Sequence, residues 1–295
     1  MDPTQIIFGG VVAPALVAGL ILTLACKVWS KEPQQTTGAW AGAPALCAAF
    51  VVGFILLLGE PASVGPDSDR TPTGLDWIFW ISLPCALFLP LSPRQGLWAQ
   101  LIRLIVGVTL IRYVLRSQFE SNWSYAEGWQ WLAGLSALFL GLWAALERLT
   151  SRPPPASSPI ILWTLTTSLA VLAAMTGSAK IGQLGGTVAA GLGAAQILSW
   201  RKPGFNLAGS GTAMVLTLVF GLGLNAYFYS YTPGVDILLL ASAPFLALLT
   251  ELPAMRKLKP GRRTLVTYSL FALPIAVALT RAGIELLNAS DEYDY

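Results

Sequence analysis

The sequence predicts an all-α integral membrane protein, a bundle of about ten transmembrane helices. Three observations support this prediction: the composition, the number of apolar runs of spanning length, and the distribution of basic residues. The chain has 295 residues, of which 55% are apolar and 11% charged, and its mean hydropathy is +0.63. Soluble domains carry about 25% charged residues. Since one span takes about 20 residues, the spans fill the chain and leave one membrane domain, residues 1–295.

Polar, glycine-rich or proline-rich segments bound ten apolar runs. The first run follows MDPTQ, which lacks the basic start of a signal peptide, and no A-x-A cleavage site follows, so we expect a retained helix. Glu60 and Pro61 end the second run, and three prolines at 153–155 follow the fifth. The predicted spans are 6–28, 38–58, 75–92, 97–114, 129–146, 160–176, 181–200, 209–227, 235–250 and 264–287.

Each later span has a local justification. The third is short and reaches spanning length only with Asp76 and the Ser92 edge, and the fourth carries Arg103 inside its apolar run. The fifth follows a segment rich in Trp and Tyr, which is typical of the membrane interface. The sixth and seventh form a pair joined by GSAK, and the eighth and ninth a pair joined by SYTPG. The last follows the basic loop MRKLKPGRR.

The seventh span has small residues at positions 182, 186, 189 and 193. This spacing predicts a helix that packs closely against a neighbour, because small side chains let two backbones approach. Static packing is one interpretation of the glycines, and a moving gate helix is the other.

Basic residues alternate between the two sides of the ten predicted spans. Lys and Arg are retained on the cytoplasmic side, and this rule assigns both termini to the non-cytoplasmic side. The chain has 18 Lys and Arg, of which three (Arg70, Arg116 and Lys180) fall on the opposite side and three (Arg103, Arg112 and Arg281) lie inside spans. The twelve assigned to the cytoplasmic loops are Lys27, Lys31, Arg94, Arg148, Arg152, Arg201, Lys202, Arg256, Lys257, Lys259, Arg262 and Arg263.

A pattern Gly-x-Asp-x5-Ser-x-Pro begins at Gly74 and again at Gly234. A looser form has Gly128, Gln130 and Ser136, and a remnant has Gln183 and Ala189, so the third position recurs at 76, 130, 183 and 236. The intervals of 54, 53 and 53 residues predict parallel repeats of two helices each. The alternative is accident, because polar helix starts and small residues are common in membrane helices.

The absence of His excludes several chemistries. The chain has no His, so a Ser-His-Asp triad, a His-ligated haem and an HExxH zinc site are all excluded. Its three cysteines, Cys26, Cys47 and Cys85, lie inside apolar runs without CxxC spacing and are expected to be buried hydrophobes. We therefore predict no cofactor, no metal site and no catalytic residue.

Arg103 is the strongest candidate for a binding residue, because an Arg inside a span must pair, reach the surface or face water. Gln100 lies on the same helical face and could share a ligand with it. The functional interpretation is an anion or carboxylate site. The structural alternative is an Arg whose long stem reaches backbone carbonyls or lipid phosphates.

Polar residues at the outer ends of the repeats are further candidates for substrate binding, namely Asp76, Gln130, Gln183 and Asp236. In the last span, Arg281 and Glu285 have the i, i+4 spacing of a structural ion pair. Asp67 and Asp69 form a D-x-D in the long outer loop, a pattern that holds a divalent metal in membrane glycosyltransferases using lipid-linked sugars.

These features favour a permease or channel-like protein for a small solute, which would be anionic if Arg103 binds it. The alternative is a non-catalytic membrane subunit or scaffold of a larger complex, because apart from Glu285 near an end we find no acid deep in a span, and ion-coupled transport generally needs one. A glycosyltransferase using the D-x-D is the remote alternative.

The expected location is the cell (inner or plasma) membrane. The expected partners are the lipid bilayer, with anionic lipids at the basic loop 256–263, and a protein partner or a second copy of the chain. The basic cluster is short and has no interleaved aromatic residues, so no nucleic acid is expected.

Overall fold

The computed structural model of the protein describes residues 3–28, 34–64, 70–91, 96–151, 157–202 and 205–291, and every regular element in these ranges is helical. Among the described residues, ten helices are long and apolar enough to cross a membrane, which confirms the predicted helical class and the predicted number of helices of spanning length. The D-x-D residues Asp67 and Asp69 lie outside the described residues.

The first span is continuous from α1 (Pro3–Ile7) through a π-helical turn, η1 (Phe8–Val12), into α2 (Ala13–Val28). The next four are α3 (Gln34–Leu58), α4 (Gly74–Phe88), α5 (Leu97–Val114) and α6 (Tyr125–Thr150), with a second π-helical turn, η3 (Gln118–Asn122), before α6. The last five are α7 (Ser157–Met175), α8 (Ala179–Arg201), α9 (Ser210–Tyr229), α10 (Gly234–Leu248) and α12 (Pro260–Asp291).

The fifth span is longer at both ends than the sequence predicted. Ser124 caps it: its Oγ accepts from the N–H of Glu127 at 3.3 Å, and the Glu127 carboxylate accepts from the N–H of Ser124 at 2.9 Å. This reciprocal capping starts α6 one turn early. At the other end Thr150 donates to the carbonyl of Leu146 within the last turn, at 2.8 Å. Glu147, one residue beyond the predicted end of the span at 146, therefore lies inside the helix.

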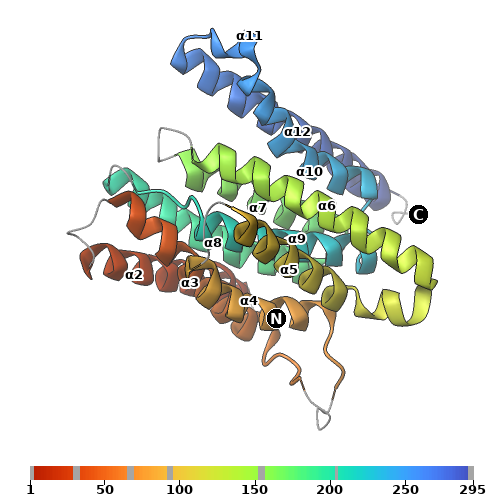
Figure 1. Ribbon diagram of the computed structural model, residues 1–295. Helices are drawn as coiled ribbons and strands as arrows, with labels where there is room; N and C mark the ends of the chain where they lie inside the picture. Colours follow the sequence, from red (N-terminus) through yellow and green to blue (C-terminus); the bar gives the residue numbers. More distant parts are fainter. Residues whose placement is uncertain are drawn as a thin grey trace.

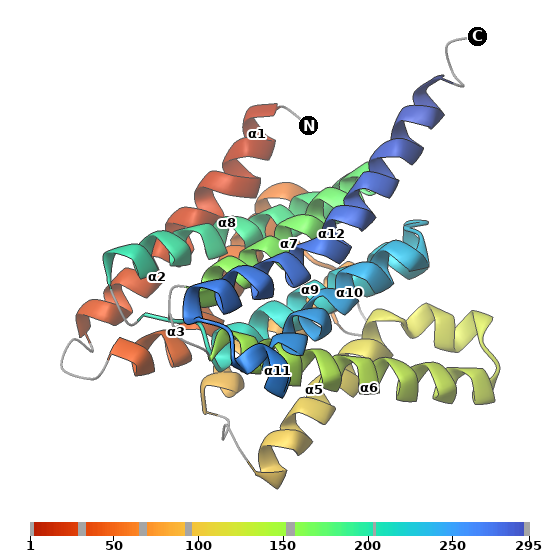
Figure 2. The same ribbon diagram turned by 90° about the horizontal axis from the view of Figure 1, so that it is seen from above.

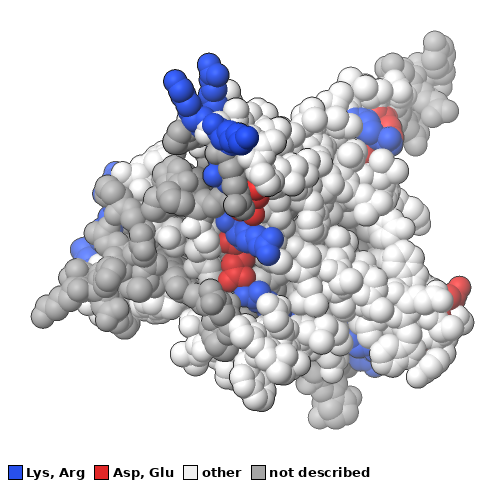
Figure 3. Space-filling view, turned by 45° about the horizontal axis from the view of Figure 1, so that its top comes forward, with Lys and Arg blue, Asp and Glu red and all other residues white. Residues whose placement is uncertain are grey.

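The basic segment 256–263, expected as a loop, is largely helical. A short helix, α11 (Pro253–Arg256), begins with proline, and α12 begins at Pro260 rather than at 264. Proline suits the first turn of a helix, where its missing N–H would have no intrahelical partner. Figure 3 shows the resulting projection, with Lys and Arg gathered over α11 and the start of α12. Lys257, Lys259 and Arg262 are exposed there.

Helix α9 lies in the centre of the bundle and is the most buried of the ten. The hairpin of α10 and α12 covers one side of the molecule, and α2, α3 and α4 cover the opposite side (Figure 1). The two termini lie at the same end of the bundle, away from α11 (Figure 2). Large side chains such as Phe50, Phe54 and Phe139 fill the core between the layers.

The predicted close packing of the seventh span is present, and it involves the predicted Gly182 together with Gly185, which the spacing had not included. A methyl group on Gly182 would lie 2.9 Å from the carbonyl oxygen of Ala170, and one on Gly185 would lie 2.8 Å from the Ala170 Cβ, so α8 packs on α7 through these two residues. Gly186, which the spacing had singled out, faces open space. Of the two interpretations, the packing supports the static one.

Candidate functional site

Helices α4 and α10, which begin with the repeated pattern, have the same local structure. Each has 15 residues and continues into a 3-10 turn of three, η2 (Leu89–Leu91) after α4 and η4 (Leu249–Glu251) after α10. In both, the serine of the pattern donates to the carbonyl three residues earlier at 2.7 Å, Ser82 to Phe79 and Ser242 to Leu239. Each also contains the proline of the pattern.

The first glycine of each pattern lies against the end of α9. A Cβ on Gly74 would lie 2.6 Å from Oδ1 of Asn225 and 3.0 Å from the carbonyl oxygen of Val114. A Cβ on Gly234 would lie 2.9 Å from the ring of Tyr227. Only glycine allows these approaches without displacement, so α4 and α10 meet the same turn of α9 with their first turns.

The aspartates at the third position have different surroundings. Asp76 closes a capping box with Thr73: its Oδ2 accepts from the N–H and the hydroxyl of Thr73, at 2.8 and 2.7 Å. Its Oδ1 accepts from the N–H of Ala62 at 3.0 Å, and Arg70, which is largely exposed, lies 3.5 Å away. Asp76 is therefore a fully bonded helix cap.

Asp236 lies in the first turn of α10, at the end of the span where the sequence placed it, but its side chain is buried, with 0% exposure. Helix α12 packs along α10 and brings Nε of Arg281 to 3.1 Å from Oδ1 of Asp236. Among the described residues, no donor makes a hydrogen bond to either carboxylate oxygen, so the contact with Arg281 is an ion pair only. Nη2 of Arg281 also lies 3.5 Å from Oε1 of Glu285, the partner that the spacing predicted.

Arg103 has a protein partner that the sequence analysis missed. Its Nη2 lies 2.6 Å from Oε2 of Glu147, and its guanidinium lies 5.4 Å from the centre of the Trp143 ring, within cation–π range. The Arg103 side chain is only 10% exposed. The Arg therefore already holds a carboxylate, supplied by the extended part of α6. Glu147 is visible in the sequence as a possible partner of Arg103. The predicted fifth span ended at residue 146, however, and so left this acid outside the helix.

The remaining predicted binding residues do not form one site. Gln100 on α5 and Gln130 on α6 are exposed, and Gln183 on α8 is half-buried. The six candidate substrate-binding residues are spread over five helices, α4, α5, α6, α8 and α10.

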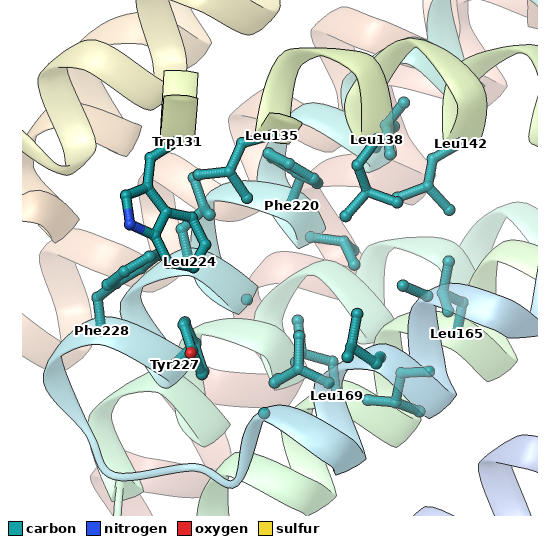
Figure 4. Close-up of a pocket in the computed structure, with 18 residues that line it drawn as sticks. Trp131, Leu135, Leu138, Leu142, Leu165, Leu169, Phe220, Leu224, Tyr227 and Phe228 are labelled. Atoms are coloured by element: carbon teal, nitrogen blue, oxygen red, sulfur yellow. The ribbon is translucent and has the colours of Figure 1, made fainter. Parts of the chain in front are cut away.

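The structure contains a cavity of about 210 Å³ between α6, α7, α9 and α10 (Figure 4). Its wall is almost entirely apolar, and Arg103 and Glu147 are not among the described residues that line it. Leu135, Leu138 and Leu142 form one wall from α6, opposite Leu165 and Leu169 of α7 (Figure 4). The helical spacing of the α6 leucines is visible in the sequence, but it gave no sign that neighbouring helices leave a space beside them.

Aromatic side chains surround one end of the cavity. Trp131, Tyr227 and Phe228 lie together at this end, and Leu142 and Leu165 lie at the other (Figure 4). Trp131 is T-shaped to Phe228, with ring centres 5.5 Å apart, and stacks on Trp123 at 5.7 Å. Trp131 and Tyr227 are both 39% exposed, so this end is the mouth of the cavity.

No protein-family model, curated protein or solved structure matches the chain.

Proposed function

We propose that the protein is a permease-like membrane protein that binds a small apolar or amphipathic solute in the cavity between α6, α7, α9 and α10. The observation that carries the proposal is the cavity itself, which is apolar along its length and exposes aromatic rings at its mouth. An apolar cavity of about 150 Å³ stays dry and binds benzene. A cavity of 210 Å³ accordingly suits one ring or a short hydrocarbon segment.

The surroundings of Arg103 favour such a solute over the anion that the sequence suggested. Because Glu147 neutralises Arg103 at 2.6 Å, an incoming anion would have to displace a carboxylate that is covalently part of the protein. The displaced Glu147 carboxylate, whose side chain is 24% exposed, would then lose its ionic partner. Binding of an apolar solute in the cavity displaces neither Arg103 nor Glu147, because neither is among the described residues that line it.

Filling the cavity tests solute binding. Leu169→Trp places a large side chain in the cavity, and Val171→Trp, on the exposed side of the same helix, is its matched control. With protein in lipid nanodiscs and fluorobenzene as the probe, we expect ¹⁹F line broadening beyond that of empty nanodiscs for the native protein and Val171→Trp. It should be lost in Leu169→Trp. Equal broadening in all three would refute the cavity as the binding site.

Uptake into proteoliposomes tests transport. Benzyltrimethylammonium and benzenesulfonate share an aromatic ring and carry fixed charges that hinder passive crossing. We expect uptake of at least one by the native protein and by Val171→Trp, and no uptake by Leu169→Trp. Fluorobenzene binding without uptake of either ion would instead favour the second function below.

A non-transporting subunit or scaffold of a larger complex is the second candidate, and the closed environment of Arg103 favours it. Arg103→Cys in a background without Cys26, Cys47 and Cys85 can be treated with an impermeant maleimide, with Tyr231→Cys, a position 96% exposed, as the labelled control. Both candidates predict labelling at 231 and none at 103. Labelling at 103 would restore a water-filled path to the Arg and with it the anion permease.

The common local structure of α4 and α10 supports the inference that they are two copies of one unit, as the repeat predicted. Both run in the same direction along α9, with which their first glycines pack. Helices α6 and α8, assigned to the looser copies, lack the shared 15-residue length and the 3-10 turn.

The charge distribution supports a cell-membrane location with both termini non-cytoplasmic and the end at α11 in the cytoplasm. There the exposed Lys257, Lys259 and Arg262 would contact anionic lipid, each contributing about 1 kcal/mol. Binding to vesicles with and without phosphatidylserine, compared between the native protein and a variant with these three changed to Gln, tests the contact. Equal binding would argue that the basic residues serve topology alone.

A further inference from the structure

Asp236, Arg281 and Glu285 form a small charged cluster between α10 and α12, next to the cavity but separate from its lining. Arg281 lies between the two acids, 3.1 Å from Asp236 and 3.5 Å from Glu285. Arg281 and Glu285 are partly exposed, at 44% and 53%, whereas the side chain of Asp236 is completely buried. The cluster thus joins one inaccessible carboxylate to two groups near the surface.

The charges of this cluster do not balance. Two carboxylates and one guanidinium have a net charge of −1, and the buried member has the poorest solvation. Helices α7 and α9 contain no Asp, Glu, Lys or Arg. Tyr227 and Tyr229 are the titratable groups of α9, and Tyr227 lies against the start of α10. At this end of α6 the acid is Glu127, which caps its own helix.

Hydrogen bonding does not compensate Asp236. A buried ionised group is stable only when it is paired and hydrogen-bonded. Asp76, at the same position of the same pattern, accepts three hydrogen bonds from Thr73 and Ala62. Asp236 accepts none from the described residues and has one ion pair, to a half-exposed Arg. Binding of one proton to Asp236 would make the cluster neutral and remove the energetic cost of a buried anion.

We infer that Asp236 is a proton-binding site, and that Arg281 is shared between Asp236 and Glu285 so that it has an anion in either protonation state. A proton from water bonds to a carboxylate oxygen of Asp236 and forms a neutral carboxylic acid. Arg281 then keeps Glu285 as its ionic partner, and the net charge of the cluster goes from −1 to 0. When the proton leaves, Arg281 again compensates Asp236. This exchange is independent of what the cavity binds.

The position of Asp236 links the proton to the cavity wall. Gly234 and Ile237, on either side of Asp236 along α10, both line the cavity. A change in the attraction between α10 and α12 therefore acts on a helix that forms one wall. An ionisable residue within a span is a functional candidate by default, and here its partner is identified.

Infrared spectroscopy of the protein in dodecyl maltoside, a detergent without ester groups, tests the inference, because a protonated carboxyl group then accounts for any C=O stretch in the carboxylic region. Ordinary Asp and Glu, with pKa values of about 3.9 and 4.3, are ionised at neutral pH. We expect a carboxylic band at neutral pH in the native protein and in Asp76→Asn, the matched control, and no band in Asp236→Asn. Lack of the band in the native protein, or its persistence in Asp236→Asn, would overturn the inference.

Two variants of the neighbours keep the test decisive if Asp236→Asn does not fold. In Arg281→Gln no guanidinium stabilises the ionised form of Asp236, so the carboxylic band should persist to higher pH than in the native protein. In Glu285→Gln the repelling anion is gone, so the band should disappear at lower pH. Opposite charges shift such titrations by about one to three pH units. Unchanged titrations in both variants would assign the band to another group. Fluorobenzene broadening is measured separately, so failure of either inference leaves the other intact.

Discussion

Helices α4 and α10 share one pattern and one local structure, but their aspartates do different things. Asp76 is bonded by backbone and hydroxyl donors of its own neighbourhood, and Asp236 depends on a side chain from a distant helix. The cause begins one residue before the pattern. Thr73 precedes Gly74 and supplies a hydroxyl and an N–H, whereas Pro233 precedes Gly234 and has neither. Both acids are buried, and the residue before the pattern determines whether the acid has a capping partner at the start of its own helix.

The dependence on the distant helix should produce the largest difference between the two copies. At a pH high enough to ionise Asp236, Arg281→Leu leaves this buried carboxylate without its ion pair to Arg281, and we expect a loss of about 2–3 kcal/mol because an orphaned buried charge is costly. Arg70→Leu is the matched change at Asp76 and should cost less than about 1 kcal/mol, since Arg70 is exposed. Thermal unfolding in detergent at that pH measures both.

Equal losses from the two Arg changes would contradict the comparison. Protonation of Asp236 in Arg281→Leu should reduce the loss at neutral and acid pH, whereas the loss in Arg70→Leu should stay small throughout. The pH dependence of the difference therefore identifies which carboxylate is responsible.

The glycines that lie against α9 should also distinguish the copies. Gly74→Ala would place its methyl group against the buried amide of Asn225 and a backbone carbonyl, neither of which moves easily, so we expect a loss of about 1–3 kcal/mol. Gly234→Ala would meet only the partly exposed ring of Tyr227, which can rotate away, and should cost less. Gly134→Ala, which faces open space, is the control. A larger loss from Gly234→Ala would show that Tyr227 is fixed.

Removal of the cap should have a moderate effect. Thr73→Val keeps the shape of the side chain but removes the hydroxyl that bonds Asp76, and we expect a loss of about 1 kcal/mol. Thr164→Val is the control, because the hydroxyl of Thr164 only donates back to the carbonyl of Ile160 in its own helix. Similar losses in thermal unfolding would mean that the capping box contributes nothing beyond an ordinary threonine.

The smallest effect on stability, and the sharpest test of the comparison, should come from Pro233→Thr, which places the α4 cap before α10. The lost rigidity of proline, about 0.4–1 kcal/mol, and the gained cap of about 1 kcal/mol largely offset each other. The new donors should stabilise ionised Asp236, so the carboxylic infrared band at neutral pH should disappear. A band of native intensity would show that the absence of a cap is not what protonates Asp236.

Much of the architecture was predictable from the sequence. Long apolar runs and their polar boundaries predicted ten helices, and the structure has ten of spanning length. The capping boxes were also readable in principle: Ser124 and Glu127 have the spacing of such a box, which would have started α6 at Tyr125 rather than at 129. Overlooking it, and placing the other end of the span at 146, left Glu147 outside the helix and Arg103 without its partner.

What the sequence by itself determined is the set of helices and the excluded chemistries, because these depend on local composition and on residue types that are present or missing. Tertiary structure alone decided that Arg103 meets Glu147, that Arg281 covers Asp236, and that α6, α7, α9 and α10 leave a cavity. The physical reason is that in a membrane protein the faces toward lipid, core and cavity are all apolar. Periodicity therefore marks a helix without telling which of its faces meets a neighbour.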